Sequence, residues 1–163
     1  MYCYIVVSRR LHERAWVLLR QGKVAFLISV IGHEAAQVGA IFALRRGQDW
    51  LVPYYRDLGM LLALGLTPLE FMLGLMGKQG EPSSGARQMP SHWSLRRANV
   101  VSHSSPVATQ SRHASGIEFD AIDGQPVRLV VLIAGPQDAQ DRYLRLLARL
   151  SGRRHRVITA VAV

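Results

Sequence analysis

The chain has 163 residues, enough for one ordinary domain or two small ones, and 49% of them are apolar, so a packed core is expected. Its 20 basic and 11 acidic residues give a net charge of +9, and 18 of the basic residues are arginines. These arginines are scattered, with no basic helix and no interleaved aromatic residues, which argues against nucleic-acid binding.

Cysteine usage and the apolar runs bear on the compartment. A single cysteine, Cys3, cannot form an internal disulfide, which is typical of the reducing cytoplasm. Arginines follow the apolar start instead of preceding it, so no signal peptide is expected. The longest apolar run, 58–77, is interrupted by Pro68 and Glu70, and neither half reaches the roughly 18 residues of a spanning helix. The sequence therefore predicts a cytoplasmic protein without a membrane segment.

Helical periodicity predicts two helices in the first third of the chain. The first covers 1–21 and is ended by Gly22. The second covers 33–46 and is closed by Gly47.

The next stretch alternates between extended chain and short helices. Residues 49–57 are expected to be extended, because Pro53 cannot donate to a strand ladder and disfavours helix at the residue before it. A helix is then expected from about Asp57 to Gly65. The sequence "TPLE" at 67–70 predicts another helix start, with a threonine cap, a proline at the first helical position and a glutamate that completes a capping box.

The final part of the chain differs in pattern from the first. Residues 77–115 show no periodicity, and a loop of this length is expected to be functional. Residues 124–135 then predict a turn and a buried strand, 136–152 an amphipathic helix, and 156–163 a last strand. We therefore predict an α/β protein of two parts. Residues 1–115 form a helix-rich part with a long loop, and 116–163 form a short β-α-β unit.

Two histidine patterns resemble metal sites only in part. "HEAAQ" at 33–37 begins like a zinc-protease helix, but Gln37 replaces the second histidine, so a plain helix start with a glutamate near its positive end is favoured. His92, His103 and His113 are spaced by eleven and ten residues, which matches no metal-binding template.

"PYYRDLG" at 53–59 is a stronger indication of a ligand site. Tyr55 and Arg56 precede an expected helix start, where backbone N–H groups favour anions, and an arginine grips a phosphate through two hydrogen bonds. The alternative is a surface Arg56 paired with Asp57. The residues alone leave both interpretations open.

Seven ordered stretches resemble one family, the alpha subunit of the thiamine-diphosphate-dependent 2-oxo acid dehydrogenase first component, of the pyruvate and branched-chain type. The similarity covers residues 1–113. The stretches are "RRLHERA", "RQGKVAF", "IGHEAAQVGA", "PYYRDLG", "LGLTPLE", "GARQMPSHW" and "SSPVATQ".

This resemblance implies a truncated thiamine-diphosphate-binding fold and assigns a role to "SSPVATQ" at 104–110. Hard cations take hydroxyl, amide and carbonyl oxygens, which this polar turn offers. The resemblance implies the following residues: Tyr55 and Arg56 contact the diphosphate, Ser105 and Val107 contact the aminopyrimidine end, and Ser104, Pro106, Thr109 and Gln110 bind a potassium ion.

The resemblance also implies an oxidoreductase acting on an oxo group, with no catalytic residue of its own in this chain. It implies a beta subunit that joins the alpha subunit in a heterotetramer and supplies the glutamate for cofactor activation, and a lipoyl-bearing acyltransferase component. The family's Gly-Asp-Gly…Asn magnesium motif does not occur in these 163 residues. The chain by itself is therefore expected to be inactive.

Residues 116–152 are similar to a second family, the C-terminal part of fructose-type phosphotransferase-system IIA domains. The stretches "FDAIDGQPVRL" and "LRLLARL" carry this resemblance. Arg112 stands where that family has proline before its phosphoacceptor histidine, and Tyr143 stands where it has a second histidine, so phosphotransfer is assigned to neither position. Two other interpretations stay open beside the dehydrogenase one: a sugar-transport or regulatory fragment, and a non-catalytic chimera.

Overall fold

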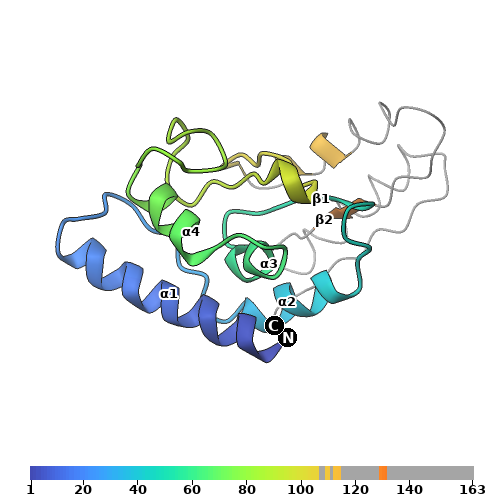
Figure 1. Ribbon diagram of the computed structural model, residues 1–163, viewed down its shortest axis with the longest axis horizontal. Helices are drawn as coiled ribbons and strands as arrows, with labels where there is room; N and C mark the ends of the chain where they lie inside the picture. Colours follow the sequence, from blue (N-terminus) through green and yellow to red (C-terminus); the bar gives the residue numbers. More distant parts are fainter. Residues whose placement is uncertain (107–108, 111, 115–128, 132–163) are drawn as a thin grey trace.

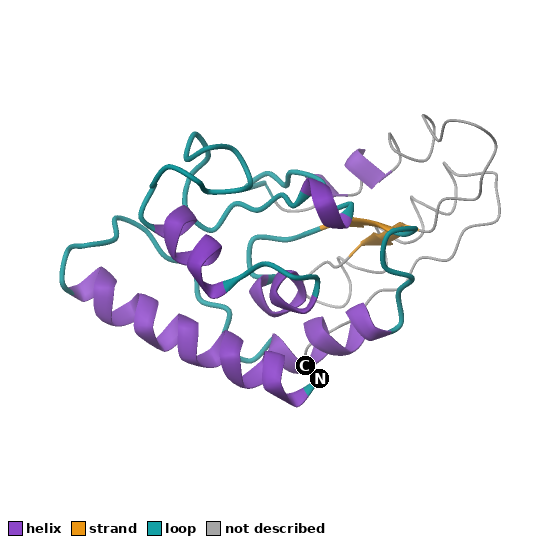
Figure 2. Cartoon of the chain, viewed as in Figure 1, coloured by secondary structure: helices purple, strands orange, loops and turns teal. Residues whose placement is uncertain are grey.

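The computed structural model describes residues 1–106, 109–110, 112–114 and 129–131 (Figure 1). This part of the chain is helix-rich, and long loops connect the helices (Figure 2). In chain order the elements are α1 (Tyr2–Arg20), α2 (Glu34–Phe42), β1 (Trp50–Val52), α3 (Leu58–Ala63), α4 (Pro68–Leu75), the 3-10 helix η1 (Arg96–Ala98) and β2 (Leu129–Val131).

The first predicted helix is confirmed. α1 spans the expected residues and runs along one side of the molecule, against α2, α3 and α4 (Figure 1). Its buried stripe contains Ala15 and Leu18, together with two polar residues, Ser8 and His12. Helical spacing places these four residues on one face, so the stripe that packs against the other helices is partly polar.

The second predicted helix is shorter than the sequence indicated, since α2 ends at Phe42 and not at residue 46. The N–H groups of Ala43 and Leu44 bond carbonyls three residues back, which tightens the last turn. The N–H of Arg45 donates to the carboxylate of Asp49, at 2.8 Å. This local side-chain acceptor competes with the helix and ends it early.

The two short helices agree with the sequence predictions. All six residues of α3 are buried, as expected of a helix that is apolar on every side. α4 has the complete capping box: the N–H of Glu70 donates to the Thr67 hydroxyl, and the N–H of Thr67 donates to the Glu70 carboxylate. Pro68 occupies the first turn, where its missing N–H costs nothing.

The predicted extended stretch contains β1, which has a parallel neighbour on each side. β2 pairs with it in the register Trp50–Leu129, Leu51–Val130 and Val52–Val131. On the other side, Leu51 bonds to segment 99–101: its N–H donates to Asn99 (2.9 Å) and its carbonyl accepts from Val101 (2.8 Å). β1 therefore lies between two segments that are distant in the sequence.

The core is made by the helices together with the long loop. Trp93, Leu95 and Val100 of the loop are buried in the same cluster as the residues of α3. The absence of periodicity in 77–115 therefore does not mean that this segment is peripheral. In the described residues, no helix is both long enough and apolar enough to cross a bilayer.

Candidate functional site

The parallel pairing around β1 brings the two predicted cofactor stretches to one edge. Tyr55 and Arg56 follow β1, and the turn 102–106, "SHSSP", follows segment 99–101, which pairs parallel with β1. Parallel segments end at the same edge, and in α/β sheets ligands bind at the carboxyl ends of the strands. The topology thus places both predicted contacts at one end of β1.

Trp93 links these two stretches directly. Its indole N–H donates to the carbonyl oxygen of Tyr55 (3.2 Å), and its main-chain N–H donates to Nδ1 of His103 (3.0 Å). The side chain is 4% exposed and stacks on Phe71 of α4, with ring centroids 5.7 Å apart. The buried Trp93 therefore connects Tyr55 to the turn 102–106.

Arg56 is held in place by its neighbours without being neutralised. Its guanidinium donates to the carbonyl oxygen of Ser29 and lies 5.3 Å from the centre of the Tyr55 ring. Within the described part of the chain, no carboxylate forms an ion pair with it. Most of its five N–H donors thus stay available to an anion.

The alternative pairing of Arg56 with Asp57 is wrong. The Asp57 side chain is buried, and its carboxylate accepts the N–H of Tyr54 at 2.6 Å. Burial raises the pKa of Asp57 to about 7. The carboxyl group thus accepts a bond within the local turn, and it forms no ion pair with the neighbouring Arg56.

Gln37 fixes the backbone of this stretch from α2. Its side-chain amide donates to the carbonyl of Arg56 (2.8 Å) and accepts the N–H of Gly59 (3.1 Å). A Cβ at Gly59 would lie 3.0 Å from the Gln37 side-chain oxygen, so a side chain there would force Gln37 to shift. One buried amide therefore sets the position of Arg56 relative to α2 and α3.

We expect Gln37→Leu to destabilise the chain by about 2–3 kcal/mol, because it leaves one donor and one acceptor buried without partners. Gln48→Leu is the matched control, since Gln48 is exposed and is expected to change stability by less than about 0.5 kcal/mol. Urea unfolding followed by circular dichroism measures both. Equal effects of the two substitutions would show that the bridge contributes nothing.

The predicted role of "HEAAQ" as a plain helix start is confirmed. Glu34 lies in the first turn of α2, and its carboxylate accepts the N–H of Gly32 (2.8 Å) and the Nε–H of Arg9 (2.6 Å). Burial alone would raise the pKa of Glu34, but the hydrogen bond from Arg9 and the backbone donors outweigh it and lower the pKa. Burial also lowers the pKa of His33, and the nearby charge of Arg56 lowers it further.

The structure describes all four predicted cation ligands, Ser104, Pro106, Thr109 and Gln110. The hydroxyl and N–H of Thr109 donate to the carbonyl of Pro106, at 3.0 and 3.3 Å, while Ser104 is half-buried. Gln110 is 1% exposed, and both of its amide atoms lack a hydrogen-bond partner among the described residues. A buried polar group without a partner suits a ligand site. Val107 lies outside the described residues.

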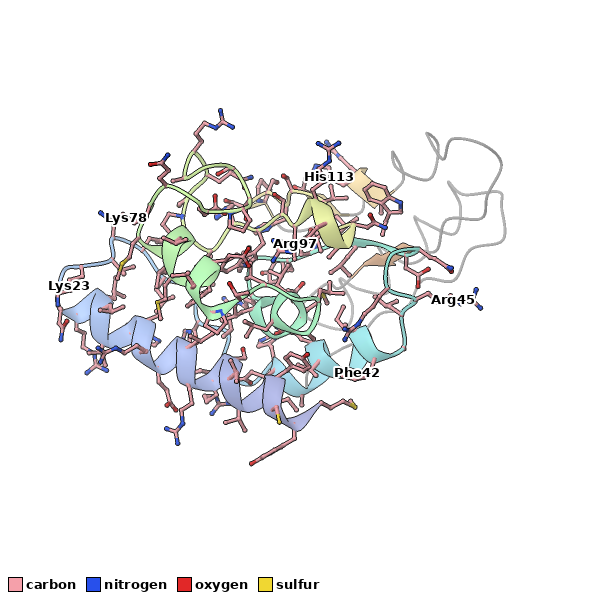
Figure 3. All side chains as sticks on the ribbon, in the orientation of Figure 1. Lys23, Phe42, Arg45, Lys78, Arg97 and His113 are labelled. Carbon is pink, nitrogen blue, oxygen red and sulfur yellow. The ribbon has the colours of Figure 1, made fainter. Side chains whose placement is uncertain are left out.

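Two of the loop histidines stack on each other beside this turn. The rings of His92 and His103 are 4.7 Å apart and 17° from parallel. Nε2 of His92 is hydrogen-bonded to the hydroxyl of Ser105, and the Tyr55 ring lies 6.5 Å from His103. His113 lies on the side of the molecule opposite α1 (Figure 3).

Sequence reasoning missed three residues that organise the site: Gln37, Trp93 and His103. From the sequence, Gln37 indicates only that a second zinc ligand is missing, and His103 indicates only a polar loop residue. Composition offered a signal for Trp93 alone. A tryptophan in a polar loop of Gly, Ser and Pro needs an apolar surface to cover it, which indicates that the loop packs on the core.

Residues 3–135 match the dehydrogenase E1 component family. The chain is 49% identical over 117 residues to the 2-oxoisovalerate dehydrogenase subunit alpha of Bacillus subtilis (strain 168), a match that covers 72% of this chain and 36% of that protein. The mitochondrial subunit alpha of Mus musculus is 34% identical over 123 residues, covering 75% of this chain and 27% of that protein. The mitochondrial 2-oxoisovalerate dehydrogenase subunit alpha 1 of Arabidopsis thaliana is 37% identical over 100 residues, covering 61% of this chain and 21% of that protein.

The chain therefore spans little more than a third of the length of the bacterial relative, and less of the other two. The family match extends over most of the chain and includes every residue of the site described above. This chain belongs to the dehydrogenase E1 component family.

Proposed function

We propose that this chain supplies the alpha-subunit side of a thiamine-diphosphate site in a branched-chain 2-oxo acid dehydrogenase. Tyr55 and Arg56 would hold the diphosphate, and Ser105 and Val107 would contact the aminopyrimidine. The observation that carries the proposal is the placement of Tyr55, Arg56 and the turn 102–106 at one end of β1, joined through Trp93.

The chemistry of the described residues fits this cofactor. Arg56 carries a positive charge that no described carboxylate neutralises. Such a site favours a phosphorylated anion. When bound, the cofactor supplies the carbanion stabilisation that decarboxylation of a 2-oxo acid needs.

A potassium site in the turn is part of the proposal. Ser104, Pro106, Thr109 and Gln110 would be its ligands, and the buried amide of Gln110 without a described partner supports this assignment. Magnesium would accompany the diphosphate in the assembled enzyme, through a motif that these 163 residues do not contain.

The partners and the substrate follow from the family and the relatives. The named relatives are 2-oxoisovalerate dehydrogenase alpha subunits, so we infer a branched-chain 2-oxo acid as substrate. We also infer a beta subunit in a heterotetramer and a lipoyl-bearing acyltransferase component. The cytoplasmic location stays a prediction that depends on the single cysteine.

The proposal is tested by titrating the ¹⁵N-labelled chain with cofactor fragments and following its amide signals by NMR. Thiamine is expected to shift Ser104 and Ser105, inorganic pyrophosphate is expected to shift Tyr55 and Arg56, and thiamine diphosphate is expected to shift both groups. The affinity is expected to be weak, on the order of millimolar or about −4 kcal/mol, because the magnesium motif is absent. Arg56→Ala should abolish the pyrophosphate response, and Arg10→Ala, on the exposed side of α1, should not.

Turnover of pyruvate and 2-oxoisovalerate completes the test. The chain alone is expected to decarboxylate neither, because lost positioning of a bound cofactor costs several powers of ten in rate. If the chain alone decarboxylated a 2-oxo acid, and Arg56→Ala abolished this activity, the proposal that this chain supplies only one side of the site would be contradicted. Pyrophosphate shifts that are spread over the arginines of α1 would contradict the site itself.

The division at residue 115/116 stays a prediction. The β1–β2 pairing and the family match to residue 135 both extend across it. The similarity of 116–152 to phosphotransferase IIA domains also stays a prediction, since apart from 129–131 it falls outside the described residues. No observation favours phosphotransfer as a second function.

A further inference from the structure

His103 and Trp93 are joined by two hydrogen bonds that run in opposite directions. Nδ1 of His103 accepts the main-chain N–H of Trp93 at 3.0 Å, and the main-chain N–H of His103 donates to the Trp93 carbonyl at 3.3 Å. His103 is 3% exposed. In a strand ladder the Trp93 N–H would bond to a carbonyl oxygen, but here it bonds to Nδ1 of His103. Segment 90–93 and the turn 102–106 are therefore joined without forming a sheet.

The geometry fixes the proton on the His103 ring. Nδ1 accepts a hydrogen bond only when it carries a lone pair, so the ring is neutral and Nε2 carries the proton. Burial lowers the pKa of His103 to about 4, and the neighbouring His92 contributes to this lowering.

His92 adds a second connection between the same two segments. Its Nδ1 lies 3.2 Å from the carbonyl of Pro90, which requires a proton on Nδ1. Nε2 is hydrogen-bonded to the hydroxyl of Ser105. Each of the two stacked rings therefore joins segment 90–93 to the turn.

We propose that His103 is a positioning residue, whose Nδ1 lone pair fixes the turn 102–106 against segment 90–93. Trp93 also holds the Tyr55 carbonyl, so this contact sets the separation between the turn and Tyr55. In the site proposed above, on which this part of the inference rests, that separation is the distance between the two ends of the cofactor.

A residue that only fills volume would behave differently from one that accepts a hydrogen bond, and two substitutions separate the roles. His103→Phe keeps a buried ring and removes the acceptor. His103→Asn is smaller, but its amide oxygen lies where Nδ1 lies. If His103 acts as a positioning residue, His103→Asn keeps the turn 102–106 in contact with segment 90–93 and His103→Phe does not. If His103 only fills volume, His103→Phe keeps this contact and His103→Asn loses it.

The experiment is amide hydrogen exchange of the ¹⁵N-labelled full chain. The Trp93 amide is expected to exchange slowly in the wild type and in His103→Asn, and about tenfold or more faster in His103→Phe. The Ser104 and Ser105 signals should move in His103→Phe and stay near their wild-type positions in His103→Asn. Imidazole ¹⁵N shifts should show a protonated Nε2 in His103 and a protonated Nδ1 in His92.

If His103→Phe does not fold, His103→Gln replaces it, because its amide oxygen lies one bond further out and does not reach the Trp93 N–H. A Trp93 amide that is protected in the phenylalanine or glutamine variant and unprotected in the asparagine variant overturns the proposal. Equal protection in all variants overturns it as well.

Thiamine, added at millimolar concentration, separates this inference from the proposed function. Shifts at Ser105 in the wild type and in His103→Asn, but not in His103→Phe, support both. If thiamine shifts Ser105 in none of the chains, but the Trp93 amide still exchanges faster in His103→Phe than in His103→Asn, the proposed cofactor site is wrong and the positioning of the turn is supported. If all variants respond equally although the Trp93 amide exchanges rapidly in His103→Phe, His103 does not position the ligand, and the inference fails.

Discussion

Replacing Phe71 by alanine is expected to destabilise the chain by about 3–5 kcal/mol, the range for removing a buried aromatic side chain. Phe71 lies in α4, is 1% exposed and stacks on Trp93, with the two ring centroids 5.7 Å apart. The substitution removes buried apolar surface and a stacking contact, which contributes about 0.5–1.5 kcal/mol by itself. Since a domain of this size is stable by about 5–15 kcal/mol, the loss is a large fraction of the total.

The same substitution should also disturb the site, because Trp93 loses the ring that supports it. The thiamine response at Ser105 is expected to disappear in a Phe71→Ala chain that is still folded. Leu69→Ala is the control: it lies in the same helix, it is 68% exposed, and it should cost less than about 0.5 kcal/mol. Urea unfolding gives both values. A cost for Phe71→Ala no larger than the cost for Leu69→Ala would contradict the packing described here.

The change in unfolding free energy caused by Asp57→Asn is expected to be more favourable at pH 8 than at pH 4, by up to about 4 kcal/mol. This value follows from the raised pKa of Asp57, at about 1.4 kcal/mol per pKa unit. Burial raises the pKa of the Asp57 carboxyl from 3.8 to about 7. A carboxyl whose pKa is raised by folding contributes stability that is fully present below about pH 4 and is lost as the pH rises toward 7. Asparagine stays neutral throughout, and its amide oxygen can still accept the N–H of Tyr54.

The measurement is urea unfolding of both chains at pH 4, 6 and 8. The difference in unfolding free energy between variant and wild type isolates Asp57, since all other groups titrate in both chains. The difference should grow steadily between pH 4 and 7 and then level off. A difference that is independent of pH would show that the carboxyl group ionises as it does in the unfolded chain.

Local chemistry determined the short elements of this protein. The capping box at Thr67 and Glu70 and the proline at 68 need only neighbouring residues, so the start of α4 was predictable from the sequence. The longer helix α1 was predictable as well, because its apolar spacing and the glycine after it are local signals. The resemblance of seven ordered stretches also indicated the family, because side chains that contact a cofactor leave fixed local patterns.

Competition between nearby groups already limited the local prediction. The periodicity of α2 continues past Phe42, but the Asp49 carboxylate takes the Arg45 N–H and ends the helix. A hydrogen bond of this kind depends on how the chain turns after the helix. The pairing of Arg56 with Asp57 failed for a similar reason, since burial turned the carboxylate toward the Tyr54 N–H.

The sequence by itself, through its resemblance to the family, predicted Tyr55, Arg56 and the polar turn "SSPVATQ" as contacts for a diphosphate and a hard cation. Only the tertiary structure decided that they share an edge. β1 pairs with segment 99–101 across almost fifty residues of chain, and Trp93 and His103 close the gap between Tyr55 and the turn. Such contacts have no local pattern, because each depends on the burial of Trp93 against Phe71 in a core that forms only when the whole chain folds.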